Sequence, residues 1–159
     1  MRLYELPPEQ IDIAIHRESI VHSLVEFKDG AILAQLGTAD MRLPIQYALT
    51  WPDRICGPAT ELDLFSCPPL TFARPDLDTF RCLALALECA KKGGTSTAVL
   101  NGANEAAVAL FLEDRIAFAD IAKLVEGALH RVSTVQNPNL EDILEADRAA
   151  RAAVNELMR

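Results

Sequence analysis

The sequence has few basic residues and few glycines, and each shortage excludes a class of function. Lysine and arginine together number 15 against 23 aspartates and glutamates, so the 159-residue chain carries a formal net charge of −8. Nucleic acid and anionic membrane surfaces bind clustered cations, and the nearest approach to a cluster is Lys91-Lys92. The seven glycines form no G-x-G-x-x-G or phosphate-loop pattern. We therefore expect no nucleic-acid partner, no membrane partner and no nucleotide site within this chain.

Long apolar runs are absent as well. The longest stretch without a charged residue, 93–104, is shorter than the roughly 18 residues that suggest a membrane-spanning helix. Residues 1–6 show no apolar run followed by small residues, so no secretory signal is recognised and a cytoplasmic location is expected. The four cysteines fit no C-x-x-C pattern, and we interpret them as reduced and mostly buried. They are Cys56, Cys67, Cys82 and Cys89.

Apolar residues make up 50% of the chain, which is enough for a core, and its first third predicts strands. Residues 11–15 alternate around Asp12, and residues 20–27 are rich in β-branched and aromatic side chains. Asp29-Gly30 then predicts the turn of a hairpin whose second arm is 31–36, because this dipeptide tolerates the positive φ of such turns.

The rest of the chain predicts helices. Apolar residues at helical spacing predict one short helix over 40–51, and the proline-rich segment 52–75 is interpreted as a connector. Four helices joined by short loops follow, which is typical of a small bundle. They are expected over 75–92, with Phe80, Leu83, Leu87 and Ala90 as the apolar face, over 98–114, over 120–132, and from a cap at Asn139 onward. The prediction is an α+β fold with three parts: strands, hairpin and short helix in 1–51, a connector in 52–75 and a C-terminal four-helix bundle in 76–159.

Two histidines, His16 and His22, lie close together in the strand region. If the chain stays extended between them, their even separation places both imidazoles on one face of a sheet, with Ser19 and Ser23 as hydroxyl donors. The alternative is structural: one histidine bonds to backbone at a strand end and the other is half buried. A small stand-alone enzyme that uses both histidines as acid and base is a third interpretation.

A second candidate lies where the hairpin leads into the short helix. Asp40, Met41 and Arg42 occupy this junction, and loops held by a rigid scaffold often carry ligand contacts. Asp40 is equally suited to cap the helix, which leaves Arg42 as an anion contact and Met41 as an adaptable apolar lid.

The third candidate is polar and lies in an apolar helix. Asn101 and Glu105 are four residues apart and share a helix face, with Asn104 nearby. A single carboxylate is too few for a dedicated site for a hard cation. We therefore favour a buried hydrogen-bond network between helices over a metal or substrate site, and we expect no metal ligands in this chain.

These segments together resemble the C-terminal part of the 1-deoxy-D-xylulose 5-phosphate reductoisomerase family. The most specific stretch is Asp40-Met41-Arg42-Leu43-Pro44-Ile45-Gln46-Tyr47-Ala48-Leu49, and the resemblance extends over nearly the whole chain. Other matching segments are Pro7 to Ile11, His16, Ser19 to Ser23, Val25 to Phe27, Asp29-Gly30, Ala34 to Gly37, Leu70 to Phe72, Pro75-Asp76, Gly93-Gly94, Ala98 to Asn101, Ala103 to Glu105 and Asp120-Ile121.

The resemblance implies an oxidoreductase and isomerase of isoprenoid biosynthesis by the non-mevalonate pathway. Such enzymes are dimers that use NADPH and a divalent metal, Mn²⁺, Mg²⁺ or Co²⁺, to convert 1-deoxy-D-xylulose 5-phosphate to 2-C-methyl-D-erythritol 4-phosphate. Residues 1–51 would correspond to the end of the catalytic domain and 76–159 to the helical bundle. The cofactor turn, the metal ligands and the phosphate-binding cluster of the family would all lie upstream, so no catalytic residue is expected in this chain.

The family resemblance also implies roles for individual residues. His22 matches the second histidine of the H-P-Q-S-x-x-H-S motif and Met41 matches P-D-M-R, and both would line the substrate and nicotinamide pocket. His16, Ser19, Asp40 and Arg42 would lie next to these lining residues.

The chain departs from the family pattern at three places. Arg17-Glu18 replaces Pro-Gln, Ala39 replaces Pro, and Gly102 stands where alanine is usual. Losing two prolines is expected to loosen turns that border the pocket, and Gly102 should cost about 1 kcal/mol of helix stability unless close packing requires it.

The leading hypothesis is a C-terminal fragment of the reductoisomerase that is inactive alone. It would form a homodimer or associate with the missing N-terminal half. The alternative is a non-enzymatic, self-associating module, in which the strand over 11–15 offers an unpaired edge.

Overall fold

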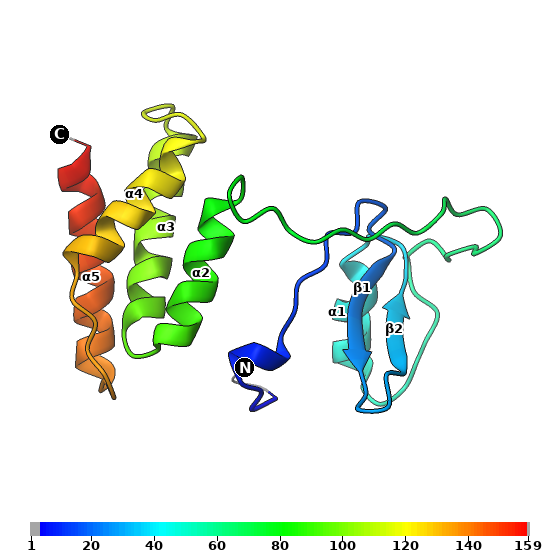
Figure 1. The fold of residues 1–159 in the computed structure, drawn as a ribbon. Coiled ribbons are helices and arrows are strands. Elements are labelled where there is room, and N and C mark those ends of the chain that lie inside the picture. The colour runs from blue at the N-terminus through cyan, green and yellow to red at the C-terminus, as the bar shows by residue number, and fades with distance from the viewer. Residues whose placement is uncertain (1–3, 159) are drawn as a thin grey trace. The chain divides into compact units, whose positions relative to one another are not determined.

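The computed structural model describes residues 4–158 and divides the chain into two compact units. One unit is residues 13–75, and the other joins residues up to Asp12 to the segment from Asp76 onward. Figure 1 traces the chain through both. The expectation that there is no secretory signal was based on residues 1–6, of which residues 1–3 lie outside the described residues. The three-part division at residues 51 and 75 stays a prediction.

A two-stranded antiparallel hairpin forms the centre of the first unit, as predicted. Strand β1 (Val21–Glu26) pairs with β2 (Ile32–Leu36), so the α+β class is confirmed. Gly30 has a φ of +84°, and the turn is closed by Phe27 N–H donating to Ala31 C=O at 2.8 Å. The Asp29 carboxylate accepts from the Ala31 N–H at 3.0 Å, so the Asp-Gly pair does what the sequence suggested.

The strand predicted over residues 11–15 is wrong. Residues 11–14 are not in a strand, and Ile15 forms an isolated bridge in which it exchanges two backbone hydrogen bonds with Ala73 at 2.9 and 3.0 Å. An alternating pattern produces a strand only where a neighbouring strand supplies a row of backbone hydrogen-bond partners. At Ile15 the pairing is limited to one bridge with Ala73. The unpaired edge on which the self-association hypothesis depended is therefore not formed.

The short helix α1 (Arg42–Thr50) follows β2 and confirms the helix predicted there. Beyond it, residues 52–75 form no helix or strand apart from the bridge at Ala73, in keeping with their prolines. This segment nevertheless belongs to the same compact unit as the hairpin and α1.

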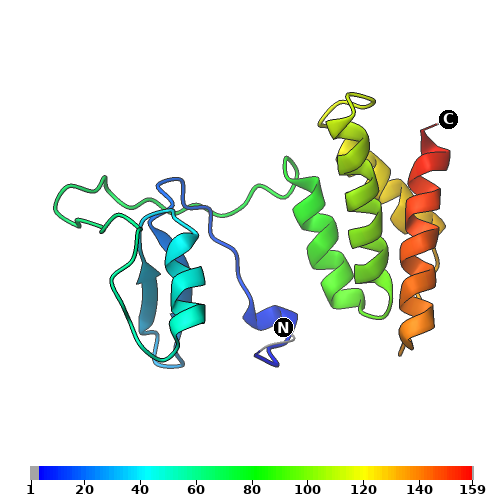
Figure 2. The same ribbon diagram turned by 180° about the vertical axis from the view of Figure 1, so that it is seen from behind.

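Four helices pack together in the second unit, as Figures 1 and 2 show from opposite sides. They are α2 (Arg81–Lys92), α3 (Ser96–Leu112), α4 (Asp120–Arg131) and α5 (Leu140–Leu157). The predicted bundle is confirmed, and a short 3₁₀ turn, η1 (Pro8–Gln10), lies against α2. None of the helices among residues 4–158 combines the length and apolar character needed to span a membrane.

Helix α2 differs from its prediction in start and in face. The helix was predicted to start at residue 75 but begins at Arg81. Asp76 lies in a turn before the helix, where it accepts hydrogen bonds from Asp78 and Thr79. Its buried residues are Ala84, Leu85 and Cys89, whereas Phe80 is exposed. The buried face of α2 therefore differs from the predicted face: it includes the small residues Ala84 and Cys89, which the apolar pattern did not single out.

The Gly93-Gly94 pair ends α2, as predicted. Both glycines have positive φ, +69° and +60°, where a side chain would be strained. A Cβ on Gly94 would lie 2.3 Å from the Val135 carbonyl oxygen, so only glycine fits this approach. Thr95, fully buried, completes the contact by bonding to Val135 through its backbone N–H and its hydroxyl oxygen, both at 3.0 Å.

Small residues dominate the core of the bundle. The four helices bring together Leu85, Val99, Ala103, Ala107, Leu110, Ile121, Leu124, Val125, Ala128, Ala146, Ala150, Ala153 and Val154. The alanines allow α3 and α5 to approach closely. Among the cysteines, all free, only Cys89 is fully buried and Cys56 is exposed, so the expectation that most are buried was wrong.

The last helix begins with the cap that the sequence indicated. The Asn139 side chain accepts from the Asp142 N–H at 2.9 Å, and the Asp142 carboxylate accepts from the Asn139 N–H at 3.0 Å. This reciprocal capping box satisfies two backbone donors that the first turn of a helix leaves unpaired.

Gly102 gives the first testable prediction. An added Cβ would lie 2.6 Å from Asp147 Oδ1 and 3.1 Å from its carbonyl oxygen, so close packing of α3 on α5 explains the glycine. We expect Gly102→Ala to lack the gain of about 1 kcal/mol in unfolding free energy that alanine normally brings to a helix. In an Asp147→Ala background, where the carboxylate is gone but the carbonyl oxygen remains, part of that gain should appear.

Urea unfolding of the four variants of this cycle measures the coupling. Ala109→Gly, at an exposed position of α3, is the matched control and should cost about 1 kcal/mol through propensity alone. An equal effect of Gly102→Ala in both backgrounds would mean that Asp147 does not limit the packing.

Candidate ligand pocket

Four of the residues singled out from the sequence line one pocket of about 600 Å³ in the first unit: Ser19, His22, Asp40 and Met41. The other lining residues are Gln35, Thr38, Ala39, Leu43, Pro44, Tyr47 and Arg54. The pocket thus lies where the start of β1, the end of β2 and the first turns of α1 converge, and mostly apolar walls with a few polar groups are typical of small-molecule sites.

His22 owes its position to a β-bulge. Val21 pairs with Leu36 but Ser23 pairs with Gln35, so His22 is the extra residue on β1. Bulges re-aim a side chain relative to the regular alternation of a strand. The His22 Nε2 atom lies 2.9 Å from the Ser19 carbonyl oxygen. Because a carbonyl only accepts, Nε2 carries a proton, and in the neutral form of the ring the lone pair is therefore on Nδ1.

His16 does not line this pocket. The chain turns between the two histidines instead of staying extended, so the condition for a shared sheet face is not met. His16 Nε2 accepts from the Ile20 N–H at 3.1 Å, and Nδ1 lies 2.8 Å from the Thr71 carbonyl oxygen. Its side chain is only 6% exposed, which makes His16 part of the frame of the site.

Asp40 and Arg42 form a bidentate pair at the pocket rim. Arg42 Nε lies 3.0 and 2.9 Å from the two carboxylate oxygens of Asp40, and the backbone N–H of Arg42 also donates to Asp40 at 2.9 Å. These bonds, the guanidinium first, hold the pKa of Asp40 below its usual value. Helix α1 has Met41 at its N-cap position and no side-chain cap, so the prediction that Asp40 caps the helix was wrong. Arg42 is engaged by Asp40 and does not line the pocket.

Tyr47 and Arg54 line the pocket as well, although neither was singled out as a site residue from the sequence. The Arg54 guanidinium lies 3.8 Å from the centre of the Tyr47 ring, and both side chains line the pocket. Such stacking orients a cation over an aromatic face. Tyr47 follows Met41 by six residues and so could be assigned to α1, but no local pattern indicates that a residue of the connector folds back over it.

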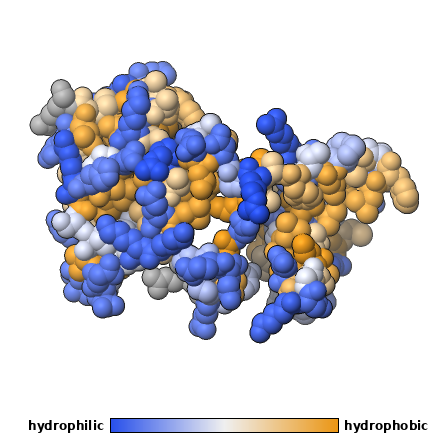
Figure 3. All heavy atoms as spheres, viewed as in Figure 1, coloured by the Kyte–Doolittle hydropathy of each residue, from blue (hydrophilic) through white to orange (hydrophobic). Residues whose placement is uncertain are grey.

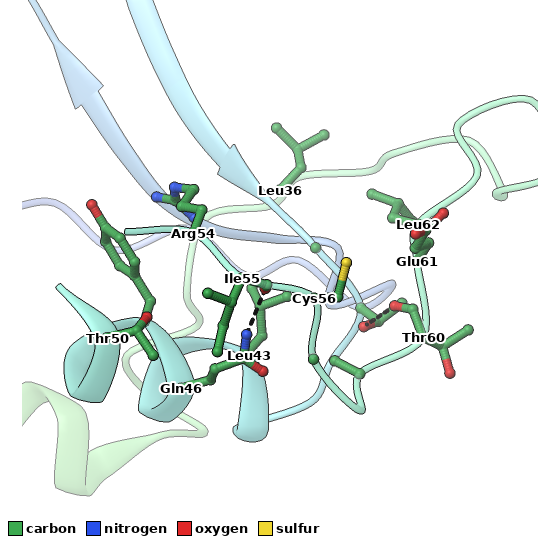
Figure 4. A pocket seen from close by; sticks show the side chains of 15 residues that line it. Leu36, Leu43, Gln46, Thr50, Arg54, Ile55, Cys56, Thr60, Glu61 and Leu62 are labelled. Atoms are coloured by element: carbon green, nitrogen blue, oxygen red, sulfur yellow. Dashed lines mark hydrogen bonds between the residues drawn. The ribbon is translucent and has the colours of Figure 1, made fainter. Parts of the chain in front are cut away.

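An adjoining pocket of about 480 Å³ lies between α1 and residues 54–62 (Figure 4). The two pockets share Thr38, Leu43, Tyr47 and Arg54. Two hydrogen bonds hold the connector here: Gln46 Nε2 donates to the Ile55 carbonyl at 2.7 Å, and the Thr38 hydroxyl donates to the Thr60 carbonyl at 2.9 Å. The connector thereby forms one wall of the site.

The polar group on α3 forms a network, but an exposed one. Asn101 Nδ2 donates to Glu105 at 3.0 Å, and Glu105 accepts from Arg151 of α5, which also bonds Asp147 at 2.8 Å. Asn101 and Glu105 are both exposed, so the expected link between helices exists but its burial was wrong. Asn104 is partly exposed beside it.

The pocket does not fit a divalent metal. Its one carboxylate, Asp40, is occupied by Arg42, whereas hard cations take several oxygen ligands. Among residues 4–158 no three or more histidine, cysteine, aspartate or glutamate side chains gather in an arrangement that could hold an ion.

Apolar side chains are also exposed on the unit that holds the pocket, and Figure 3 shows part of them in orange on one face. On the hairpin, Val25 is 57% exposed, Ile32 58% and Leu33 65%. Exposed apolar patches of this kind are typical of interaction surfaces.

The structure joins an α+β unit, which holds a mostly apolar pocket, to an alanine-rich bundle of four helices. The family model for the DXP reductoisomerase C-terminal domain matches residues 36–153. The chain belongs to this family.

Similar proteins extend the match to almost every residue. The 1-deoxy-D-xylulose 5-phosphate reductoisomerases of Geobacillus kaustophilus and Acetivibrio thermocellus are 54% and 48% identical over 157 residues each. These matches cover 98% and 99% of this chain but 41% of each relative, so the chain spans about two fifths of the length of these relatives.

Solved structures agree in fold as well as in sequence. The Zymomonas mobilis reductoisomerase in complex with NADPH has a TM-score of 0.89 and 44% identity, covering 99% of this chain and 42% of that one. A reductoisomerase in complex with NADPH, fosmidomycin and magnesium has a TM-score of 0.91 and 40% identity, covering 98% and 40%.

The Asp40–Arg42 pair gives the second prediction. Arg42→Met should raise the pKa of Asp40 toward its ordinary value of about 4, because the guanidinium contributes most to lowering it. A group whose pKa is lowered by folding stabilises the fold above its unfolded pKa and loses this effect as the pH falls through the lowered value. The difference in stability between wild type and variant should therefore be present at neutral pH and shrink below about pH 4.

NMR titration of the Asp40 carboxyl carbon measures this shift directly. Arg74→Met removes an exposed arginine from the same unit and is the control. An Asp40 pKa that is the same in Arg42→Met and in wild type would refute the assignment.

Proposed function

We propose that this chain supplies the C-terminal part of a 1-deoxy-D-xylulose 5-phosphate reductoisomerase. In that role, it forms one wall of the site in which the sugar phosphate is rearranged and reduced, and it adds the helical bundle. The observation that carries the proposal is the pocket itself: the two residues that the family resemblance assigns to the substrate and nicotinamide side, His22 and Met41, line it together.

The residues fit one end of the cofactor. Met41 is 71% exposed and flexible enough to pack on a flat ring, and His22 lies across the pocket from α1 on β1. When bound, NADPH supplies a hydride to the substrate. The part of this chain would be to line the nicotinamide end, to offer the His22 Nδ1 lone pair to a ligand donor, and to exclude water with its apolar walls.

The chain is not proposed to perform the chemistry alone. The described residues offer no metal site, whereas a reductoisomerase of known structure is in complex with magnesium. The catalytic residues, the divalent metal and the phosphate-binding groups would come from the part of the protein that this chain does not match. Without that part we expect no turnover.

Association follows from the same proposal. The exposed apolar residues of the hairpin would be covered by the rest of the protein, or by a second copy in a homodimer. The self-associating module proposed as an alternative is not favoured, because the strand edge that motivated it is not formed.

A chimera tests the proposed function. This chain would replace the matching C-terminal part of the Geobacillus kaustophilus relative, with which it is 54% identical. We expect the chimera to oxidise NADPH when given 1-deoxy-D-xylulose 5-phosphate and Mg²⁺, and the 159-residue chain alone to remain inactive.

The matched variants of the chimera separate the pocket from the rest of the fold. His22→Ala should lower kcat/KM by about tenfold to a hundredfold, since misplacing a substrate by about 1 Å costs this much. His130→Ala, in the last turn of α4, should leave activity unchanged. Turnover by the chain alone, or a folded chimera without activity, would contradict the proposal.

A further inference from the structure

The turn that connects the two histidines is anchored to a distant segment of the chain. Residues 16–20 lie against residues 71–73, beside the bridge between Ile15 and Ala73. The His16 ring stacks on Phe72 with 4.7 Å between ring centres and 15° between ring planes. Arg17-Glu18, where the chain departs from the family pattern, lies in this turn. The loss of proline there was expected to loosen the turn, and the contacts of the turn test that expectation.

Glu18 makes the strongest contacts between the two segments. Its carboxylate accepts from the Thr71 hydroxyl at 2.6 Å and from the Thr71 backbone N–H at 3.2 Å. A carboxylate oxygen also lies 2.9 Å from His16 Nδ1, and the Glu18 side chain is only 16% exposed. The hydrogen bond from the Thr71 hydroxyl is the main cause that lowers the pKa of Glu18, which keeps the carboxylate charged as an acceptor.

The protonation of His16 follows from its partners. Nε2 accepts from the Ile20 N–H at 3.1 Å, so the proton of the neutral ring is on Nδ1. Nδ1–H then donates toward the Thr71 carbonyl and the Glu18 carboxylate, at 2.8 and 2.9 Å. Both sides of the ring are satisfied, and the ring holds the turn against Thr71.

The anchored turn leads directly to the pocket. Ser19 follows Glu18 with a φ of +51°, an uncommon conformation for a residue other than glycine, which persists where surrounding contacts fix it. Its carbonyl oxygen is the acceptor for His22 Nε2–H at 2.9 Å. The direction of this carbonyl therefore selects the tautomer of His22 and leaves Nδ1 with no partner among residues 4–158.

We propose that Glu18 is a positioning residue for the pocket. Bound to Thr71 and His16, its carboxylate fixes the turn at residues 16–20, and the Ser19 carbonyl in that turn fixes the tautomer and orientation of His22. What the pocket binds rests on the proposed function, whereas the link from Glu18 to His22 is a property of this chain alone. Contacts to Thr71 thus hold the turn in which Arg17 stands in place of the family's proline.

The chain alone tests the link. In ¹⁵N NMR spectra of the histidine rings, wild type should show His22 entirely as the Nε2–H tautomer. In Glu18→Ala both ring nitrogens should move toward the averaged values of a free imidazole, whereas in Glu18→Gln, which keeps an oxygen acceptor for Thr71, they should stay near wild type. Glu26→Ala removes an exposed carboxylate at the end of β1 and should leave His22 unchanged.

A threonine pair keeps the test decisive if Glu18→Ala unfolds the unit. Thr71→Val removes the hydroxyl that Glu18 accepts and should shift the His22 ring signals, while Thr71→Ser keeps the hydroxyl and should not. His22 signals that stay at wild-type positions in both Glu18→Ala and Thr71→Val would overturn the proposal.

The chimera supplies the second arm. Glu18→Ala should lower kcat about tenfold or more with a smaller effect on KM, and Glu18→Gln should restore most of it. If the wild-type chimera is inactive, the proposed function fails and the NMR arm still decides the role of Glu18. If the chimera is active and Glu18→Ala matches wild type in kcat, the positioning role is refuted while the proposed function stands.

Discussion

The constraint on which this structure depends is the shortage of buried apolar surface in residues 13–75. Ile20 is the one large apolar side chain of this unit that is fully buried among the described residues, whereas the hairpin exposes Val25, Ile32 and Leu33 by more than half. Burial of apolar surface is the main driving force of folding, and an isolated two-stranded hairpin is marginal in water. The unit therefore needs a covering surface, which the proposed function assigns to the rest of the protein.

The helical unit has no such shortage. Its core closes over itself through small residues on α3 and α5, and a capping box, two glycines with positive φ and the Thr95–Val135 contact fix the helix ends. The ion pairs around Arg151 add little to stability, because water and salt screen charges at the surface. One chain thus combines a self-sufficient unit with one whose local geometry depends on hydrogen bonds among His16, Glu18 and Thr71.

The sequence predicted the elements well and the contacts between them poorly. Asp29-Gly30, Gly93-Gly94 and Asn139 each act through backbone angles or hydrogen bonds within a few residues along the chain, and all three were placed correctly. The strand over 11–15 failed because pairing requires a neighbour that no local pattern reveals.

The residues of the candidate site could likewise be predicted within elements but not where distant segments meet. Ser19, His22, Asp40 and Met41 were named from the sequence and share one pocket, because the hairpin and α1 adjoin in sequence. Tyr47 with Arg54 and Glu18 with Thr71 were missed, because each pair joins a predicted element to the connector, whose path over the unit has no periodic signal.

Amide hydrogen exchange, compared between the chain alone and the chimera, tests the central claim most directly. If residues 13–75 are one wall of a larger domain, the amides of β1 and β2 should be at least about a hundredfold better protected in the chimera, while those of α3 and α5 should differ little. Equal protection of β1 and β2 in both proteins would mean that the unit is complete by itself, and would contradict the account.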